Sequence, residues 1–97
     1  MTYADRQRLE RALATAQAAA IVARATAAGY ERAALWHEHD DAPGSAALWS
    51  RAWDRQQWWE LRAEDEEETA AEIEAQIGDG EARADVAAYF ADCAGAW

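Results

Sequence analysis

Lysine is absent from this sequence, and cysteine, proline and methionine occur once each. A single cysteine, Cys93, forms no internal disulfide, so the fold does not depend on an oxidising compartment and we expect a cytoplasmic protein. No segment approaches the roughly 18 consecutive apolar residues that a membrane span needs. Thr15, Gln17 and Arg24 interrupt the alanine-rich segment near the start, which predicts a helix of the mature chain and not a secretory signal.

Large aliphatic side chains are few, although hydrophobic residues make up 52% of the 97 positions. Alanine dominates that fraction, and six tryptophans supply most of the remaining apolar area. A chain of this length folds only if most of its apolar side chains share one core. We therefore predict a single helical domain, residues 1–97, with a core of tryptophan and alanine.

The negative charge is concentrated in the second part of the chain, whose net total is −10. Residues 1–35 hold five arginines against three carboxylates, a net of +2, and residues 36–97 carry a net of −12. Direct nucleic-acid binding is disfavoured, because contacts with phosphates need a concentrated basic surface. The charge favours a basic partner instead.

The helical pattern is continuous with few interruptions. Thr2 and Asp5 have capping-box spacing, so a helix should begin near Tyr3, and Gly29 either ends or kinks it. The segment 40–45, which contains Pro43 and Gly44, reads as a loop in which Ser45 caps the next helix.

A long central helix, about residues 46–77, follows this loop, and Gly78, Asp79 and Gly80 predict its end. The spacing of Val86, Phe90, Cys93 and Trp97 then predicts a final helix with an apolar stripe. No segment alternates with a period of two. The fold class expected is all-α, an antiparallel bundle of three to four helices.

The long helix is predicted to have a core face and a composite outer face. The core face comprises Leu48, Ala52, Trp59, Ala70, Ile73 and Ile77, with Ala63 at its edge. Trp49 and Trp53 lie on a neighbouring stripe that continues into Glu60, Glu64, Glu67 and Glu68, with Glu72 further along. Adjacent helical residues differ by about 100°, so Trp59 should point inward and Trp58 outward.

Eight carboxylates lie within residues 60–74, and several form like-charge pairs four residues apart. Each such pair destabilises a helix by roughly 0.2 to 0.5 kcal/mol. Two interpretations stay open, since acidic residues keep a tryptophan-rich protein in solution and also steer basic partners.

No residue pattern indicates catalysis. His37 and His39 would lie about 200° apart on a helix and have no further histidine or cysteine cluster to complete a zinc site. Cys93 lies on an apolar stripe, which is typical of a structural thiol. We expect no metal, no cofactor and no enzyme activity.

We therefore expect a small acidic helical protein that binds another protein and competes with its nucleic acid. In size, charge and helicity it is similar to the acidic inhibitors of phages and mobile elements, such as anti-CRISPR proteins and other DNA mimics. The binding residues expected are the acids Glu60, Glu64, Glu67, Glu68 and Glu72 and the aromatic residues Trp49, Trp53 and Trp58. The alternative is an assembly protein that uses exposed tryptophans to self-associate, for example as a homodimer, or to join a complex. In this alternative the acids only keep the surface soluble.

Overall fold

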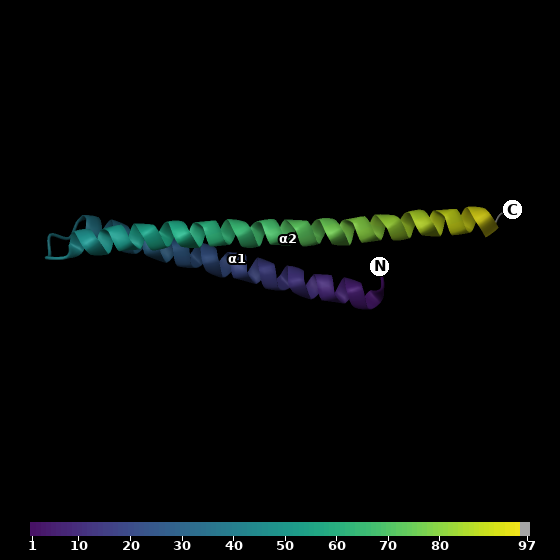
Figure 1. Cartoon of the computed structure of the whole chain (residues 1–97), viewed down its shortest axis with the longest axis horizontal. Helices are drawn as coiled ribbons and strands as arrows, with labels where there is room; N and C mark the ends of the chain where they lie inside the picture. The colour runs from purple at the N-terminus through teal and green to yellow at the C-terminus, as the bar shows by residue number, and fades with distance from the viewer. Residues whose placement is uncertain (96–97) are drawn as a thin grey trace.

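The chain forms a long hairpin of two antiparallel helices (Figure 1). In the computed structural model, which describes residues 1–95, α1 spans Tyr3–Glu38 and α2 spans Ser45–Gly95. The hairpin measures 84 × 18 × 13 Å, and its radius of gyration is 22.6 Å. A compact chain of this length would have a radius of gyration of about 12.5 Å. The all-α prediction is therefore confirmed, but the bundle of three to four helices is wrong.

The start of α1 agrees with the cap predicted from the sequence. The hydroxyl Oγ1 of Thr2 accepts a hydrogen bond from the backbone N–H of Asp5 at 3.1 Å. A hydrogen bond from Thr2 and the neighbouring guanidinium of Arg8 hold the pKa of Asp5 below its ordinary value. Gly29 does not divide the helix, because α1 continues without a break to Glu38. Alanines on both sides of Gly29 have the highest helix propensity, which offsets the cost of one glycine.

Asp40 organises the turn between the helices. Its carboxylate accepts hydrogen bonds from the backbone N–H of Ala42 at 3.2 Å and from the hydroxyl of Ser45 at 3.0 Å. Gly44 adopts a positive φ of 87°, which glycine allows without strain, and its carbonyl accepts the N–H of Leu48. The predicted loop is confirmed, but Ser45 is a buried first residue of α2 that donates to Asp40 and not the predicted cap.

The break predicted at residues 78–80 does not occur, and α2 continues to Gly95. Neither Gly78 nor Gly80 has a positive φ, so each serves as an ordinary helical residue at a cost of roughly 1 kcal/mol relative to alanine. The end of the exposed Met1 side chain lies against Gly80, and because this side chain is flexible it can move aside for a Cβ. Asp79 therefore caps no separate helix.

Small side chains line the contact between the two helices. The buried residues recur at intervals of three, four or seven along each helix, which fits the heptad repeat of a coiled coil. On α1 they are Ala16, Ala20, Ala23, Ala27 and Ala34, and on α2 they are Ala52, Gln56, Ala63 and Ala70. We call this row of buried residues the alanine seam. It brings the two backbones close together, because no large side chain separates them.

The predicted core of tryptophan and alanine is half wrong. None of the large side chains that the structure describes is fully buried, and Trp36, Trp49 and Trp58 are exposed. On α2 the predicted core face is confirmed for its alanines, whereas Trp59, Ile73 and Ile77 are half-buried and Leu48 is exposed. The predicted apolar stripe of the final helix is not covered either, because Val86 and Phe90 are exposed. Trp97 lies outside the described residues.

Across residues 1–95, neither helix has the length together with the apolar character that a bilayer crossing would require.

Candidate functional site

The surface of α2 that faces away from α1 carries a stripe of apolar and acidic side chains. Trp58, Leu61, Asp65, Glu68 and Glu72 follow one another at intervals of three and four residues, so they share one face of the helix. All five are exposed, with 53% of Trp58 and 63% of Leu61 accessible. We call these five residues the outward stripe.

Trp59 supports the apolar end of the outward stripe. The rings of Trp58 and Trp59 meet edge to face, with centroids 4.8 Å apart and an interplanar angle of 84°. Trp59 is half-buried beside the alanine seam, so it holds the exposed indole from below. Such an aromatic pair contributes about 0.5–1.5 kcal/mol beyond its buried area. The prediction that Trp59 points inward and Trp58 outward is confirmed.

The carboxylates at the acidic end of the outward stripe form no ion pair within residues 1–95. They belong to Asp65, Glu68 and Glu72, and the neighbouring Glu64 also forms none there. Glu68 lies four residues from Glu64 and from Glu72, and carboxylates at this spacing repel one another. Uncompensated carboxylates on a rigid helix form a surface that attracts cationic side chains.

Two of the acids predicted for the same surface accept hydrogen bonds within the hairpin, Glu67 from α1 and Glu60 from α2 itself. The carboxylate of Glu67 accepts hydrogen bonds from Nε and an Nη of Arg24 on α1, at 2.9 and 3.0 Å. These hydrogen bonds hold the pKa of Glu67 below its ordinary value, and the same pairing raises the pKa of Arg24. Glu60 is half-buried and accepts a hydrogen bond from the side-chain amide of Gln56 at 2.5 Å. Glu67 therefore fastens α2 to α1, whereas the contact of Glu60 lies within α2.

The predicted aromatic residues are also divided. Trp49 lies near the turn, where it lines a shallow cavity with His37 and Asp40, and Trp53 is half-buried on the side of Glu60. Neither belongs to the outward stripe, so Trp58 is the only one of the three predicted aromatic residues that lies in it. Leu61 and Asp65 join it instead, and their spacing from Trp58 is the signal in the sequence that identifies them.

The histidines near the turn form no metal site in the described part of the chain. His37 packs edge to face against Trp36, with ring centroids 4.9 Å apart, and its buried Nδ1 has no hydrogen-bond partner. No three His, Cys, Asp or Glu side chains converge on one point within residues 1–95.

No protein-family model matches this chain, and neither the curated proteins nor the solved structures give a match.

Proposed function

We propose that this protein binds a basic partner protein through the outward stripe of α2 and blocks the partner's nucleic-acid site. The observation that carries the proposal is the order of residues along one rigid helix face. Two exposed apolar side chains, Trp58 and Leu61, are followed by carboxylates without ion pairs. Apolar anchors supply affinity in protein interfaces, and charges around them select the partner and raise the rate of encounter.

The geometry of the acids suits a groove that holds a phosphate backbone. Glu64, Asp65, Glu68 and Glu72 project from about 12 Å of helix, so several arginines of a phosphate channel could pair with them at once. The narrow hairpin, 18 × 13 Å in cross-section, would enter such a channel along its length. In this function the protein acts as an inhibitor that mimics DNA. We place it in the cytoplasm, where its single free Cys93 stays reduced.

The experiment is capture of proteins from bacterial lysate on the immobilised full chain, followed by elution with duplex DNA. A partner bound at its nucleic-acid site is released by DNA, because the two ligands compete for one surface. The test variant carries Glu64→Arg and Glu68→Arg, and the matched control carries Glu31→Arg and Glu38→Arg on α1. Both variants change the net charge equally, so only a contact through α2 separates them.

The proposal predicts that the α2 variant loses the partner and that the α1 variant keeps it. Equal loss in the two variants would mean that net charge alone attracts the partner. Retention of the partner in the presence of excess DNA would mean that the protein does not occupy a nucleic-acid site. Either result would rule out the mimic.

A second function is assembly, through self-association or within a complex. It is favoured because small apolar residues are buried in this protein while large ones are exposed. The seam consists of small residues, while Trp36, Trp58 and Leu61 are exposed. Monomeric proteins rarely leave this much large apolar surface in water. Salt separates the two functions, since electrostatic capture weakens as ionic strength rises and a desolvated tryptophan contact persists.

A further inference from the structure

The C-terminal part of α2 has no partner within the hairpin. The N-terminus of the chain lies beside α2 part of the way along its length, and α2 continues beyond this point to its C-terminal end (Figure 1). Every residue from 81 to 92 is exposed, including the large side chains of Val86, Tyr89 and Phe90. We call residues 82–95 the overhang.

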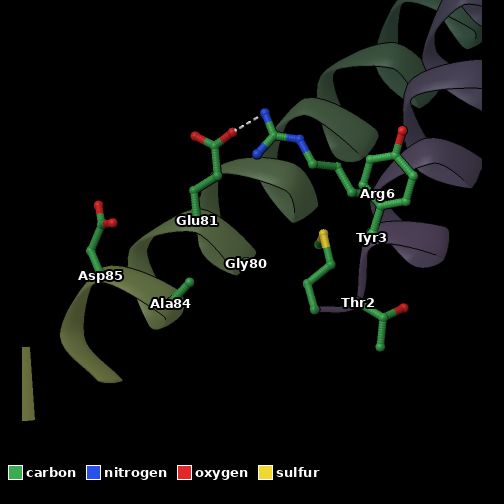
Figure 2. A pocket seen from close by; sticks show the side chains of 8 residues that line it. Thr2, Tyr3, Arg6, Gly80, Glu81, Ala84 and Asp85 are labelled. Carbon is green, nitrogen blue, oxygen red and sulfur yellow. Dashed lines mark ion pairs between the residues drawn. The ribbon is translucent and has the colours of Figure 1, made fainter. Parts of the chain in front are cut away.

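Contacts at the start of the overhang mark where α1 stops covering α2. The Met1 side chain lies against Gly80, and the guanidinium of Arg6 pairs with Glu81 at an N···O distance of 2.5 Å. Figure 2 shows this pair, with Ala84 further along the same helix. Ala84 still lines a cavity with Met1 and Tyr3, and beyond it every residue of α2 up to 92 is exposed.

The alanine seam continues into the overhang with its spacing unchanged. From the buried Ala70 the intervals of three and four lead through Ile73, Ile77 and Gly80 and then to the alanines of the overhang. These alanines are Ala84, Ala87 and Ala91, and all three are exposed. In the hairpin the same row is covered by a helix that presents alanines at the same intervals. A partner that covers the overhang in the same way is therefore also a helix with small residues at these intervals. The overhang of a second copy has this spacing.

The overhang propagates from the rest of α2 and needs no nucleation of its own, but helices gain most of their stability from tertiary packing, which residues 82–92 lack within the hairpin. The overhang therefore gains from a partner. Its charge also permits a second copy, since its only ionisable side chains besides Tyr89 and Cys93 are Arg83, Asp85 and Asp92. Residues 60–74, by contrast, hold eight carboxylates, so two copies repel one another there and not at this end.

The accessible surface of the hairpin leaves room for a dimer. It is 7247 Å², whereas a compact monomer of 10.7 kDa would expose about 5,500 Å². This excess is spread along both helices of the elongated hairpin, and it is more than the roughly 800 Å² that each partner contributes to an interface of standard size.

We infer that the overhangs of two copies pair antiparallel, each covering the open alanine seam of the other. Of the large side chains of the overhang, Phe90 lies nearest to this row, about 90° around the helix, whereas Val86 and Tyr89 lie on the opposite face with Ala82. The dimer is an end-to-end rod in which both turns lie at the outer ends. The inference gives the self-association function a location, and it does not involve the outward stripe, which stays exposed in the dimer.

The experiment measures the mass and the length of the full chain in solution. Sedimentation over a concentration series gives the dimer dissociation constant, and small-angle scattering gives the maximum dimension. Two hairpins of 84 Å that overlap by the overhang predict a rod of about 145 Å, whereas side-by-side packing predicts a particle little longer than one hairpin. The test variant carries Ala87→Glu and Ala91→Glu, which place charges in the open seam.

The matched control carries Ala75→Glu and Ala82→Glu, two exposed alanines on the opposite face of the same helix. We expect the dissociation constant to rise at least about tenfold in the seam variant and to stay unchanged in the control. All four alanines are exposed in the hairpin, so circular dichroism should show both variants folded. A monomer at every concentration, a short dimer, or a dimer that survives the seam variant would each overturn the inference. If the wild-type chain dimerises but captures no basic partner, only the proposed function of the outward stripe is refuted.

Discussion

The close packing of the alanine seam is tested by enlarging Ala63, whose side chain is completely buried. In a loosely packed coiled coil, Ala63→Leu would add three buried carbons and stabilise the hairpin by about 2 kcal/mol. The pairing of Arg24 with Glu67 places Ala63 across from the buried Ala27. A leucine there must push the helices apart and uncover the alanines on both sides. We therefore expect a loss of about 1–3 kcal/mol in the free energy of unfolding.

Urea denaturation followed by circular dichroism at the helix band measures this change directly. The control is Ala75→Leu, at an exposed position on the same helix, which should shift the free energy of unfolding by less than about 0.5 kcal/mol. The sign of the effect decides the outcome. An Ala63→Leu variant with a higher urea midpoint than the wild type would show that the helices are held apart loosely, and the account of the seam would be wrong.

Three further predictions follow from single contacts. Gly78→Ala should raise the free energy of unfolding by about 0.5–1 kcal/mol in a urea titration, because an added Cβ meets open space in a continuous helix; a break at this position would give the opposite sign. Glu67→Gln should lower the melting temperature at neutral pH. Because hydrogen bonds from Arg24 depress the pKa of Glu67 below 4.5, its contribution is complete above that value, and the difference from wild type should shrink as melting is measured from about pH 5 to about pH 2. Trp58→Ala should lower the free energy of unfolding by about 0.5–1.5 kcal/mol through loss of the aromatic pair, whereas Trp59→Ala, which loses the pair and its own burial, should lower it by about 2–3 kcal/mol, and equal losses would contradict their opposite placement.

Local signals in the sequence predicted the ends of the hairpin well. Thr2 caps α1 as its spacing to Asp5 indicated, and the proline-glycine segment forms the turn. These features depend on a few neighbouring residues, whose conformational preferences act wherever they occur.

The number of helices could not be read in the same way. Two glycines, Gly78 and Gly80, looked like a break, yet a glycine ends a helix only where the chain needs a positive φ or gains contacts by turning. A chain that turned back at these glycines would gain little, because the seam of α2 before them is already covered by α1. The cost of continuing through both glycines is roughly 2 kcal/mol, which the helical propensity of the residues on both sides offsets in part.

The core was mistaken because alanine occurs on every face of both helices. Its contribution to a hydrophobic pattern is weak, so the intervals of three and four in the seam were hidden among other alanines, and the tryptophans were assigned to the interior instead. The direction of Trp58 was predictable, since it follows from its angle relative to Trp59. The pairing of Glu67 with Arg24 was not, because it depends on the register between two helices.

The central claim is that the carboxylates of the outward stripe, together with the neighbouring Glu64, bind a cationic surface. The most direct test is the affinity of the captured partner for the wild type and for the Glu64→Arg, Glu68→Arg variant, measured from about 50 to about 500 mM salt. The account predicts that wild-type affinity falls steeply with salt and that the variant binds more weakly, with a flatter dependence. Equal affinities with equal salt dependence would contradict it and would leave these acids as surface charge alone.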